Sequence, residues 1–342
     1  MLITRAPVRI SFAGGGTDLP AYYERYGGAV VSTTIDKYFY IFLNVSGDDA
    51  IQITSSDYRT FYRHDGDAPL LLDGDLSLPR AILNHFGLTR GISMFLASEI
   101  PPGTGLGSSS TVAVAIVKAV ATARGLFLSK QQIAELACHI EIEKLGEPIG
   151  KQDQYAAAFG DLNLIQFSRD GVTVEPLRVS PETRRALEKS ILLFFTGATR
   201  EASSILRAQR QASEQNDARV LGALHAVKEM AFKAKGILES GNLGELAELL
   251  DANWQQKKKF ASGISNSFID ECYDLALQNG AGGGKMTGAG GGGFLMLYCE
   301  PQHQSTVTQA LEAKGLKRMG FRFESEGARV LVNAGLRIAV NQ

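Results

Sequence analysis

The sequence has little cysteine, no excess of positive charge and no long apolar run. Its 342 residues include three cysteines, Cys138, Cys272 and Cys299, and these are too far apart to show the paired spacing of a metal site or a disulfide framework. The formal net charge is −1, which argues against a nucleic acid or an anionic membrane as the main partner, because both need a concentrated positive field. No uncharged apolar stretch reaches about 18 residues, the length of a membrane span. The sequence therefore predicts a protein that binds a small molecule.

The cysteines and the N-terminus favour a reducing compartment. Cys138 and Cys299 lie in apolar stretches, so buried free thiols are expected. The first residues, MLITRAPVRISF, lack the uninterrupted apolar segment and the small-residue cleavage site of a signal peptide. We therefore expect a cytoplasmic protein.

Glycine is the residue present in excess. The 37 glycines make up about 11% of the chain, against roughly 7% in an average protein. The excess is concentrated in three segments, Gly14 to Gly16, Gly103 to Gly107 and Gly280 to Gly293. These segments are the first candidates for the walls of a binding site, because glycine lets the backbone approach a ligand closely.

The first half of the chain has the pattern of strands with two helices. Residues 38–45 are aromatic and β-branched, as in a strand, and two further strands at 162–167 and 172–179 flank Asp170-Gly171, a dipeptide typical of hairpin turns. One helix is predicted from residue 108 to Gly125. The other begins at a capping box formed by Ser129 and Gln132 and ends at Gly146.

The second half is rich in charged helical sequence. Helices are predicted at 182–190, 200–235, 243–260 and 302–314, with strands at 294–299 and 328–333. The fold class is therefore α+β, with residues 1–180 as one domain and 181–342 as the other. No internal repeat or low-complexity linker separates the halves, so we expect a large shared interface with the ligand in the cleft between them.

The middle glycine segment, PPGTGLGSSS at residues 101–110, runs directly into a predicted helix start. Unpartnered backbone N–H groups and the positive end of the helix dipole lie at such a place, and serines add hydroxyl donors or a Mg²⁺ ligand, so the segment is typical of a phosphate site. An ordinary glycine turn with a serine N-cap is the alternative. The sequence has no Walker A loop, because Gly284-Lys285 has Asn279 in place of the first glycine and Met286 in place of the hydroxyl residue.

Two carboxylates follow in the segment from Ile140 to Gln154. Glu141 lies at the margin of an apolar helical stripe, where it could reach a metal in a cleft, and Asp153 follows a turn that contains Gly146, Pro148 and Gly150. A carboxylate on a rigid turn suits a general base, and one at a helix edge suits a Mg²⁺ ligand. Taken alone, both residues are better explained as solvated or capping carboxylates, and the neighbouring motifs favour the functional interpretation.

Three segments together resemble a known family. RAPVRISFAGGGTDLP, PPGTGLGSSS and KMTGAGGGGF are similar, in this order and spacing, to the three motifs of the GHMP-type small-metabolite kinases, which include galactokinase, homoserine kinase, mevalonate kinase and phosphomevalonate kinase. The resemblance covers essentially the whole chain. It implies an N-terminal α+β domain joined to a ferredoxin-like C-terminal domain, with ATP and the acceptor in the cleft.

The resemblance also implies roles for individual residues. Arg9 and Asp153 match the catalytic pair, and Ser109 and Glu141 match the ligands of Mg²⁺. The galactokinase pattern Glu-x-Glu-x-x-Gly-x-Pro-x-Gly-x-x-Asp-Gln is reproduced without a gap from Glu141 to Gln154. The residues that would wrap ATP are Pro102, Gly103, Thr104, Gly105, Leu106, Gly107, Ser108, Ser109 and Ser110. The third glycine motif, which would lie beside them, contains Gly288, Gly290, Gly291 and Gly292.

One departure from galactokinases bears on the acceptor. Galactokinases have Gly-Glu-His-Thr-Asp where this chain has Gly14-Gly-Gly-Thr-Asp18, so the acidic sugar-contacting residue is missing. The first motif, GKQDQYA at 150–156, TGATR at 196–200 and the segment from Trp254 to Asn266 more closely resemble heptose 7-phosphate kinases, which phosphorylate the anomeric C1 hydroxyl of D-glycero-D-manno-heptose 7-phosphate to the 1,7-bisphosphate on the way to nucleotide-activated heptoses. The acceptor-binding residues implied are Gly16, Thr17, Asp18, Asp153, Gly197, Arg200 and Lys258.

Alternatives remain at this stage. A phosphate already on the acceptor needs a second anion site, for which Arg200 and one of Lys257 or Lys258 are the candidates, Lys258 being the choice, although a lysine run on a charged helix is usually a solvated face. A fucokinase- or galactokinase-like kinase of an unphosphorylated sugar, or a silent sensor of sugar and nucleotide, are the rival functions. The partners expected are ATP, Mg²⁺ and a sugar phosphate, with no nucleic acid and no membrane, in a monomer or homodimer.

Overall fold

The computed structural model describes residues 1–56, 59–65, 70, 72–199 and 203–338. Its first half is built on a large sheet with the strand order β13-β1-β2-β5-β3-β4, to which β6, β7 and β12 are added through β2 and β6. The long strand β2 (Gly28–Val45) is the centre of this sheet, because β1 (Leu2–Ala13), β5 (Ile92–Ser98) and β6 (Leu162–Ser168) all pair with it. β3 (Ile51–Ser55) pairs with β5 and with β4 (Thr60–His64), which lies at the edge of the sheet.

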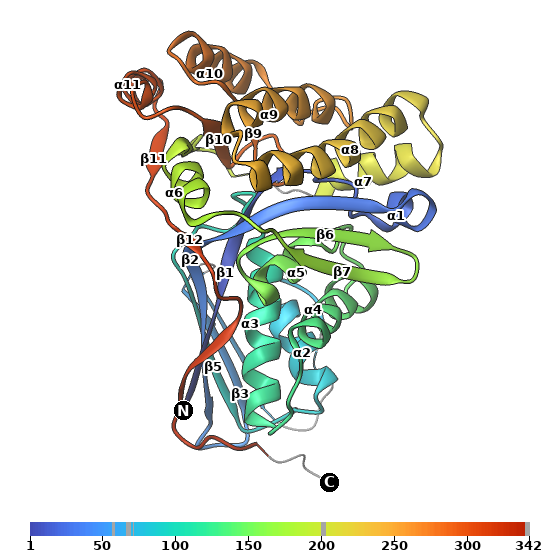
Figure 1. The fold of residues 1–342 in the computed structure, drawn as a ribbon. Coiled ribbons are helices and arrows are strands. Elements are labelled where there is room, and N and C mark those ends of the chain that lie inside the picture. The colour runs from blue at the N-terminus through green and yellow to red at the C-terminus, as the bar shows by residue number, and fades with distance from the viewer. Residues whose placement is uncertain (57–58, 66–69, 71, 200–202, 339–342) are drawn as a thin grey trace.

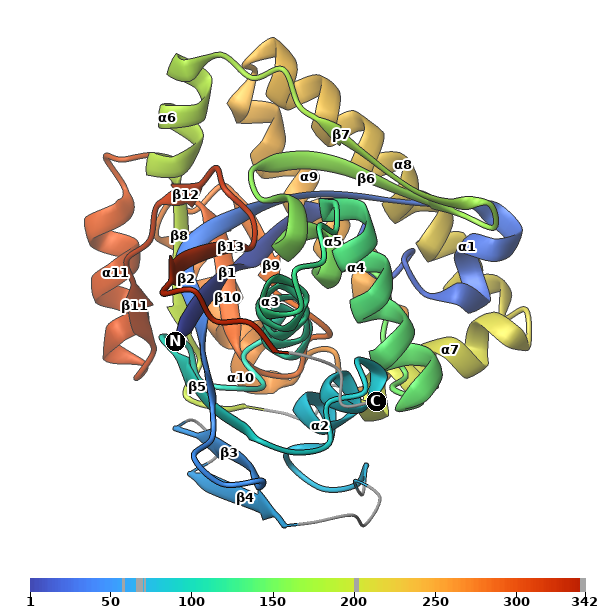
Figure 2. The ribbon, with the colours of Figure 1, turned by 90° about the horizontal axis from the view of Figure 1, so that it is seen from below.

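Helices cover one face of this sheet (Figure 1). The central one is α3 (Ser108–Ala123), which is rich in alanine and valine and buried on nearly all sides; Figure 2 shows it end-on with its neighbours around it. The helices around it are α2 (Ser77–His85), α4 (Lys130–Cys138) and α5 (Gln152–Phe159). Their apolar side chains and the covered face of the sheet form one core.

Local sequence rules predicted several of these elements. The helix predicted from residue 108 is confirmed, and so is the capping box, in which Ser129 Oγ accepts from the backbone N–H of Gln132 and Gln132 accepts from that of Ser129. The hairpin of β6 and β7 (Gly171–Pro176) is also confirmed, but its turn lies one residue earlier than predicted, at Arg169 and Asp170. The helix predicted to run to Gly146 instead changes after Cys138 into a π-helix, η1 (His139–Lys144).

The second half contains a smaller antiparallel sheet with the order β11-β8-β10-β9. These strands are β8 (Ile191–Phe195), β9 (Gly283–Met286), β10 (Phe294–Tyr298) and β11 (Lys317–Met319). Helices pack around this sheet, as the ferredoxin-like expectation requires: α6 (Pro181–Ser190), α7 (Ser203–Glu214), α8 (Ala218–Ser240), α9 (Leu243–Lys257), α10 (Ser267–Gln278) and α11 (Gln304–Ala313). The single helical segment predicted at 200–235 is interrupted at Asn216, which has a positive φ, and Asp217 caps the helix that follows.

The chain returns to the first sheet at its C-terminal end. β12 (Phe323–Glu324) pairs with β2, and β13 (Arg329–Asn333) pairs with β1 from Leu2 opposite Asn333 to Arg5 opposite Arg329. The strand predicted at 328–333 is thus confirmed, but it belongs to the sheet of the first half. The division into domains 1–180 and 181–342 stays a prediction, and hydrogen bonding joins residues 323–333 to the first of the two.

The two halves share a buried apolar interface. Val8, Ile10 and Phe12 of β1 belong to one core cluster with residues of α8 and α9, among them Leu238 and Leu250. This cluster continues into β10 of the small sheet. The helix α1 (Pro20–Tyr26) adds a further contact, in which Tyr22 Oη lies 2.7 Å from His225 Nδ1 of α8. None of the described helices is long and apolar enough to span a bilayer.

Candidate active site

The loop before α3 is shaped to hold an anion. Gly103, Gly105 and Gly107 all have left-handed φ values, between +72° and +81°, and the loop passes directly into the N-terminus of the 16-residue helix α3. Alternation of such residues turns successive backbone N–H groups toward one concave side, which the helix dipole makes positive. Ser108 Oγ at the helix start is buried without a hydrogen-bond partner, as expected for a group that awaits a ligand.

The third glycine motif packs directly against the backbone of this loop. A Cβ atom on Gly288 would lie 2.4 Å from the Cα of Gly105, and one on Gly293 would lie 2.2 Å from the carbonyl oxygen of Thr104. No side chain fits at either place. Gly290 is similarly close to the carbonyl of Ile264, and the buried Gly291 donates its N–H to the same carbonyl, at 2.8 Å, while Gly292 is buried beside it. The motif therefore brings the small sheet into backbone contact with the loop.

The Arg9–Asp153 ion pair lies beside the loop. Arg9 of β1 donates from Nε to Oδ1 of Asp153 at 2.7 Å, and its Nη2 lies 2.6 Å from the same oxygen. Its Nη1 donates to the carbonyl of Gly105 at 2.7 Å. Arg9 is 3% exposed, whereas the Asp153 side chain at the start of α5 is about one-quarter exposed. The pair thus fixes Asp153 from behind and leaves its other oxygen, Oδ2, at the cleft beside Gly107.

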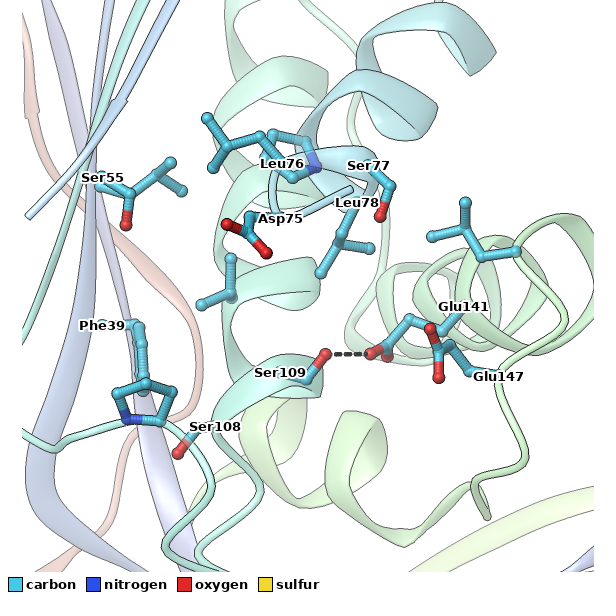
Figure 3. A pocket seen from close by; sticks show the side chains of 15 residues that line it. Phe39, Ser55, Asp75, Leu76, Ser77, Leu78, Ser108, Ser109, Glu141 and Glu147 are labelled. Carbon is cyan, nitrogen blue, oxygen red and sulfur yellow. Dashed lines mark hydrogen bonds between the residues drawn. The ribbon is translucent and has the colours of Figure 1, made fainter. Parts of the chain in front are cut away.

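Glu141 lies in the π-helix η1, on the other side of the loop from the Arg9–Asp153 pair. It accepts from Ser109 Oγ at 2.9 Å and from Gln154 Nε2 at 2.7 Å; in Figure 3 the side chains of Ser109 and Glu141 point toward each other across a hollow. Burial raises the pKa of Glu141 from 4.5 to about 7, although the hydrogen bonds from Gln154 and Ser109 oppose the rise. A π-helical turn carries one more residue than an α-turn and often occurs at functional sites. Here it contains a carboxylate that is 1% exposed.

The oxygens of Ser109 and Glu141 suit Mg²⁺. Hydroxyl and carboxylate oxygens are hard ligands, and protein-bound Mg²⁺ is commonly held by one or two carboxylates together with phosphate oxygens. Within the described ranges, no group of three or more His, Cys, Asp and Glu side chains could hold a metal ion by itself. Together with the unpartnered Ser108 Oγ, these residues fit a Mg²⁺ ion that is shared with a phosphate-bearing ligand.

Two hollows meet at Ser108 and Ser109. The first is largely apolar and is shown in Figure 3; its lining includes Phe39, Leu76, Leu78, Leu96, Val112, Asp75 and Glu147. The second contains charged and amide side chains together with apolar ones such as Leu206 and Phe260; its polar and glycine lining includes Arg9, Gly15, Gly16, Asp18, Gly150, Gln152, Asp153, Gln209, Lys257 and Gly288. An elongated molecule with an apolar end and an anionic part can therefore lie across the loop, with its apolar end in the first hollow. The second hollow can hold a polar reaction partner beside the anionic part.

Asp18 is held rigidly in the second hollow. Its carboxylate accepts from the N–H of Gly16 at 3.1 Å, the N–H of Gln152 at 3.2 Å and Nε2 of Gln152 at 3.0 Å. Burial raises its pKa, and the nearby Asp153 raises it further. Thr17, by contrast, is fully buried and donates to the carbonyl of Gly14 at 2.8 Å, so its hydroxyl supports the loop and does not line the hollow.

Of the remaining residues expected to bind the acceptor, the structure describes Gly197 and Lys258. Gly197 is exposed after β8 and lines neither hollow, and Arg200 lies outside the described residues. Lys258, the lysine chosen from the sequence, lies 3.8 Å from Asp270 and outside both linings. Its neighbour Lys257 lines the second hollow, because the end of α9 turns that residue toward the third glycine motif.

Sequence reasoning missed several residues of the second hollow. Gln152 directly precedes Asp153, so an amide beside a candidate base was a usable signal. Gln209 of α7 left no such signal, since its Nε2 donates to the carbonyl of Gly16 at 2.9 Å across 193 positions of sequence. Phe260 packs near the same Gly16, where a Cβ atom would approach its ring to 2.9 Å.

Comparison with known proteins supplies the family. Residues 77–161 match the GHMP kinases N terminal domain, and residues 233–317 match the GHMP kinases C terminal domain. A D-glycero-alpha-D-manno-heptose 7-phosphate kinase of Campylobacter jejuni is 36% identical over 332 residues, which span 95% of this chain and 97% of that protein. The L-fucokinase/L-fucose-1-P guanylyltransferase of Bacteroides fragilis is 31% identical over 90% of this chain but only 35% of that longer protein.

A solved structure has the same fold. The D-glycero-D-manno-heptose 1-phosphate kinase of Bacteroides thetaiotaomicron superposes with a TM-score of 0.81 at 30% identity, covering 98% of this chain and all of that one. The likeness in sequence to the Campylobacter jejuni protein extends over 95% of this chain and so over both of its halves. The chain belongs to the GHMP kinases and has their two-domain α+β fold.

Proposed function

We propose that this kinase transfers the γ-phosphoryl group of ATP to the anomeric C1 hydroxyl of D-glycero-D-manno-heptose 7-phosphate and forms the 1,7-bisphosphate. The observation that carries the proposal is the Arg9–Asp153 pair, which lies between the phosphate-type loop and the polar hollow that contains Asp18. The acceptor is inferred from two relatives named as heptose phosphate kinases. Their names differ in the position of the phosphate, so the acceptor and the position of transfer are the parts to be tested.

ATP fits across the two hollows. The apolar hollow of Figure 3 suits an adenine ring, and residues 102–110 suit the phosphates through backbone N–H groups and serine hydroxyls. Mg²⁺ held by Ser109 and Glu141 supplies positive charge to the terminal phosphates when bound. The chain itself contributes the rigid loop, whose contact with the glycines at 288–293 keeps it in one conformation.

Asp153 and Arg9 act on the acceptor hydroxyl. Asp153 Oδ2 accepts the proton of the C1 hydroxyl as the sugar oxygen forms a bond to the γ-phosphorus and the bond from that phosphorus to the β–γ bridging oxygen breaks, releasing ADP. Arg9 holds Oδ1 and thereby fixes the direction in which Oδ2 accepts. Such transfer needs positioning and charge stabilisation more than covalent participation by the protein.

The sugar would lie against Asp18 and the glycines of the first motif. The carboxylate of Asp18 accepts from three donors, which fixes it for hydrogen bonds to sugar hydroxyls. Galactokinases have glutamate and histidine at the positions of Gly15 and Gly16, whereas here a Cβ on Gly16 would lie 2.9 Å from both Gln209 and Phe260, and this supports an acceptor site that differs from that of a galactokinase. Arg200 and Lys258 remain proposals for the distal phosphate and Gly197 for contact with the acceptor, and the three buried free thiols support the cytoplasmic location.

A fucokinase is the second candidate. It is favoured by the relative from Bacteroides fragilis, whose name includes L-fucokinase and which matches 90% of this chain. An assay of ADP release with heptose 7-phosphate, mannose, fucose and galactose side by side separates the candidates, and ³¹P NMR of the product locates the new phosphate. Turnover of the heptose phosphate with a new anomeric signal supports the proposal. Turnover of fucose without turnover of the heptose phosphate would replace it, and ATP binding without turnover of any sugar would favour a sensor.

A further inference from the structure

Lys257 is a buried cation at the wall of the second hollow. It is the last residue of α9 and is 6% exposed. Its Nζ donates to the carbonyls of Met286 at 2.9 Å and of Gly288 at 2.5 Å. An ammonium group has three protons, so these two carbonyls leave one proton free for a ligand. Throughout residues 1–56, 59–65, 70, 72–199 and 203–338, no carboxylate lies within ion-pair distance of Lys257.

Two other basic residues, Arg9 and Lys285, lie near Lys257. Arg9 is paired with Asp153, whereas the buried Lys285 donates to the carbonyl of Phe12 at 3.1 Å and lines neither hollow. Burial and, to a smaller extent, the charge of Arg9 lower the pKa of Lys257 from 10.5 to about 7, although the charge of Asp18 opposes the fall. A buried charge is costly unless it is paired. An anionic group of a ligand in the second hollow would therefore be stabilised by Lys257.

The backbone places Lys257 next to the phosphate loop. Lys257 is anchored on the carbonyl of Gly288, and Gly288 is in contact with Gly105. The carbonyl of Gly105 in turn accepts from Arg9 Nη1. Arg9 of β1 is thus hydrogen-bonded to Gly105, and Lys257 of α9 is hydrogen-bonded to Gly288, which is in contact with Gly105.

We propose that Lys257 is a catalytic residue whose ammonium binds an oxygen of the phosphoryl group in transfer, together with Arg9. This inference deepens the proposed function and rests on it. While the bond to the bridging oxygen breaks and the bond to the sugar oxygen forms, charge is spread over the three equatorial oxygens of the phosphoryl group. Lys257 donates a hydrogen bond to one of them and transfers no proton. The third glycine motif would then do more than contact the loop, because the carbonyls of Met286 and Gly288 also orient the Lys257 ammonium.

The other possible source of phosphate oxygens is the acceptor itself. A phosphate on the far carbon of the sugar would contact Lys257 only if that end of the molecule reached the loop. The contact between Gly288 and Gly105 favours the transferred group, because it puts Lys257 beside the residues that hold the ATP phosphates. If Lys257 binds the transferred phosphoryl group, its loss should lower kcat. If it binds the phosphate of the acceptor, its loss should raise the KM of the phosphorylated acceptor.

Binding without turnover gives the first test. We expect Lys257→Met to bind ADP as the wild type does, but to bind ADP with aluminium fluoride, a mimic of the phosphoryl group in transfer, about 10- to 100-fold more weakly, the usual effect of losing a hydrogen bond to a charged group. Lys257→Arg should recover part of this affinity. Lys259→Met is the matched control, because Lys259 lies two residues further along the chain, is exposed and donates to Oε1 of Gln256 at 2.9 Å. Retained ADP affinity and an unchanged circular dichroism spectrum show that the variants are folded.

Turnover gives the second test. In Lys257→Met, kcat should fall by a similar factor with phosphorylated and unphosphorylated acceptors, while the KM of the acceptor changes little. A rise in KM confined to the phosphorylated acceptor, with kcat retained, would overturn the proposal and assign Lys257 to the distal phosphate. Equal binding of the fluoride complex by wild type and Lys257→Met would also overturn it, even where the wild type phosphorylates the heptose. If the wild type turns over none of the four sugars, the proposed function fails, and the binding test still decides the role of Lys257 because it needs no acceptor.

Discussion

The glycine at the start of α3 allows a test of how the loop positions Asp153. Gly107 has φ +81°, and a Cβ atom there would lie 3.0 Å from both Cγ and Oδ2 of Asp153. Gly125, just beyond the other end of the same helix, has φ +72° and nothing within 4 Å of its Cβ position. Gly107→Ala and Gly125→Ala therefore introduce the same backbone strain, but only the first adds an atom against the proposed base.

The size of each effect follows from these geometries. A left-handed conformation costs an L residue ~1–2 kcal/mol, and the reduced freedom of alanine in the unfolded chain returns ~0.4–1 kcal/mol. Both variants should thus lose about 1 kcal/mol of unfolding free energy in urea. In Gly107→Ala the carbon atoms must also separate by about 0.5–1 Å to reach normal contact. Arg9 holds Asp153 by two short contacts, so the loop and Asp153 are displaced relative to each other.

Displacement of reacting groups by about 1 Å lowers a rate by on the order of 10²-fold. We therefore expect kcat of Gly107→Ala to fall by roughly that factor, measured by coupled ADP release at saturating ATP and acceptor, while Gly125→Ala retains the wild-type kcat. If the two variants had the same kcat and the same stability, the contact between Gly107 and Asp153 would have no role in catalysis and the reasoning would be wrong.

Three further predictions concern the same cleft. Asp153→Asn should abolish ADP release while ATP still binds in calorimetry, because the amide cannot take the hydroxyl proton; full activity would remove Asp153 as the base. Gly288→Ala should lower the unfolding free energy by about 1–3 kcal/mol and weaken ADP binding, because its Cβ would lie 2.4 Å from the Cα of Gly105 and neither backbone can yield alone; wild-type values for both would contradict the close contact. The pKa of Lys257 falls from 10.5 when unfolded to about 7 when folded, so between these values the unfolded chain binds more protons, and the contribution of Lys257 to stability rises with pH. The excess stability of Lys257→Met over the wild type in urea should hence shrink by up to about 3 kcal/mol between pH 6.5 and pH 9.5, and an excess independent of pH would show that the ammonium is not destabilised by burial.

The sequence by itself determined the features that depend on neighbouring residues. The start of α3, the capping box of Ser129 and Gln132 and the β6–β7 hairpin follow from local preferences. The alternating glycines before a helix predicted an anion site because backbone conformation and the helix dipole are local properties. The three motifs also identified the family, since they carry this local chemistry at the right spacing.

Only the tertiary structure decided which side chains meet. The π-helical turn that contains Glu141 is not visible in the helical pattern, because apolar spacing differs little between an α-turn and one with an extra residue. The return of β13 to β1 depends on pairing between the two ends of the chain. Lys257 and Lys258 are alike in sequence, yet successive residues at a helix end project about 100° apart, and the packing of α9 turns Lys257 into the cleft and Lys258 toward Asp270. Contacts between residues far apart in the chain, such as Gln209 with Gly16, arise from packing and leave no local signal in the sequence.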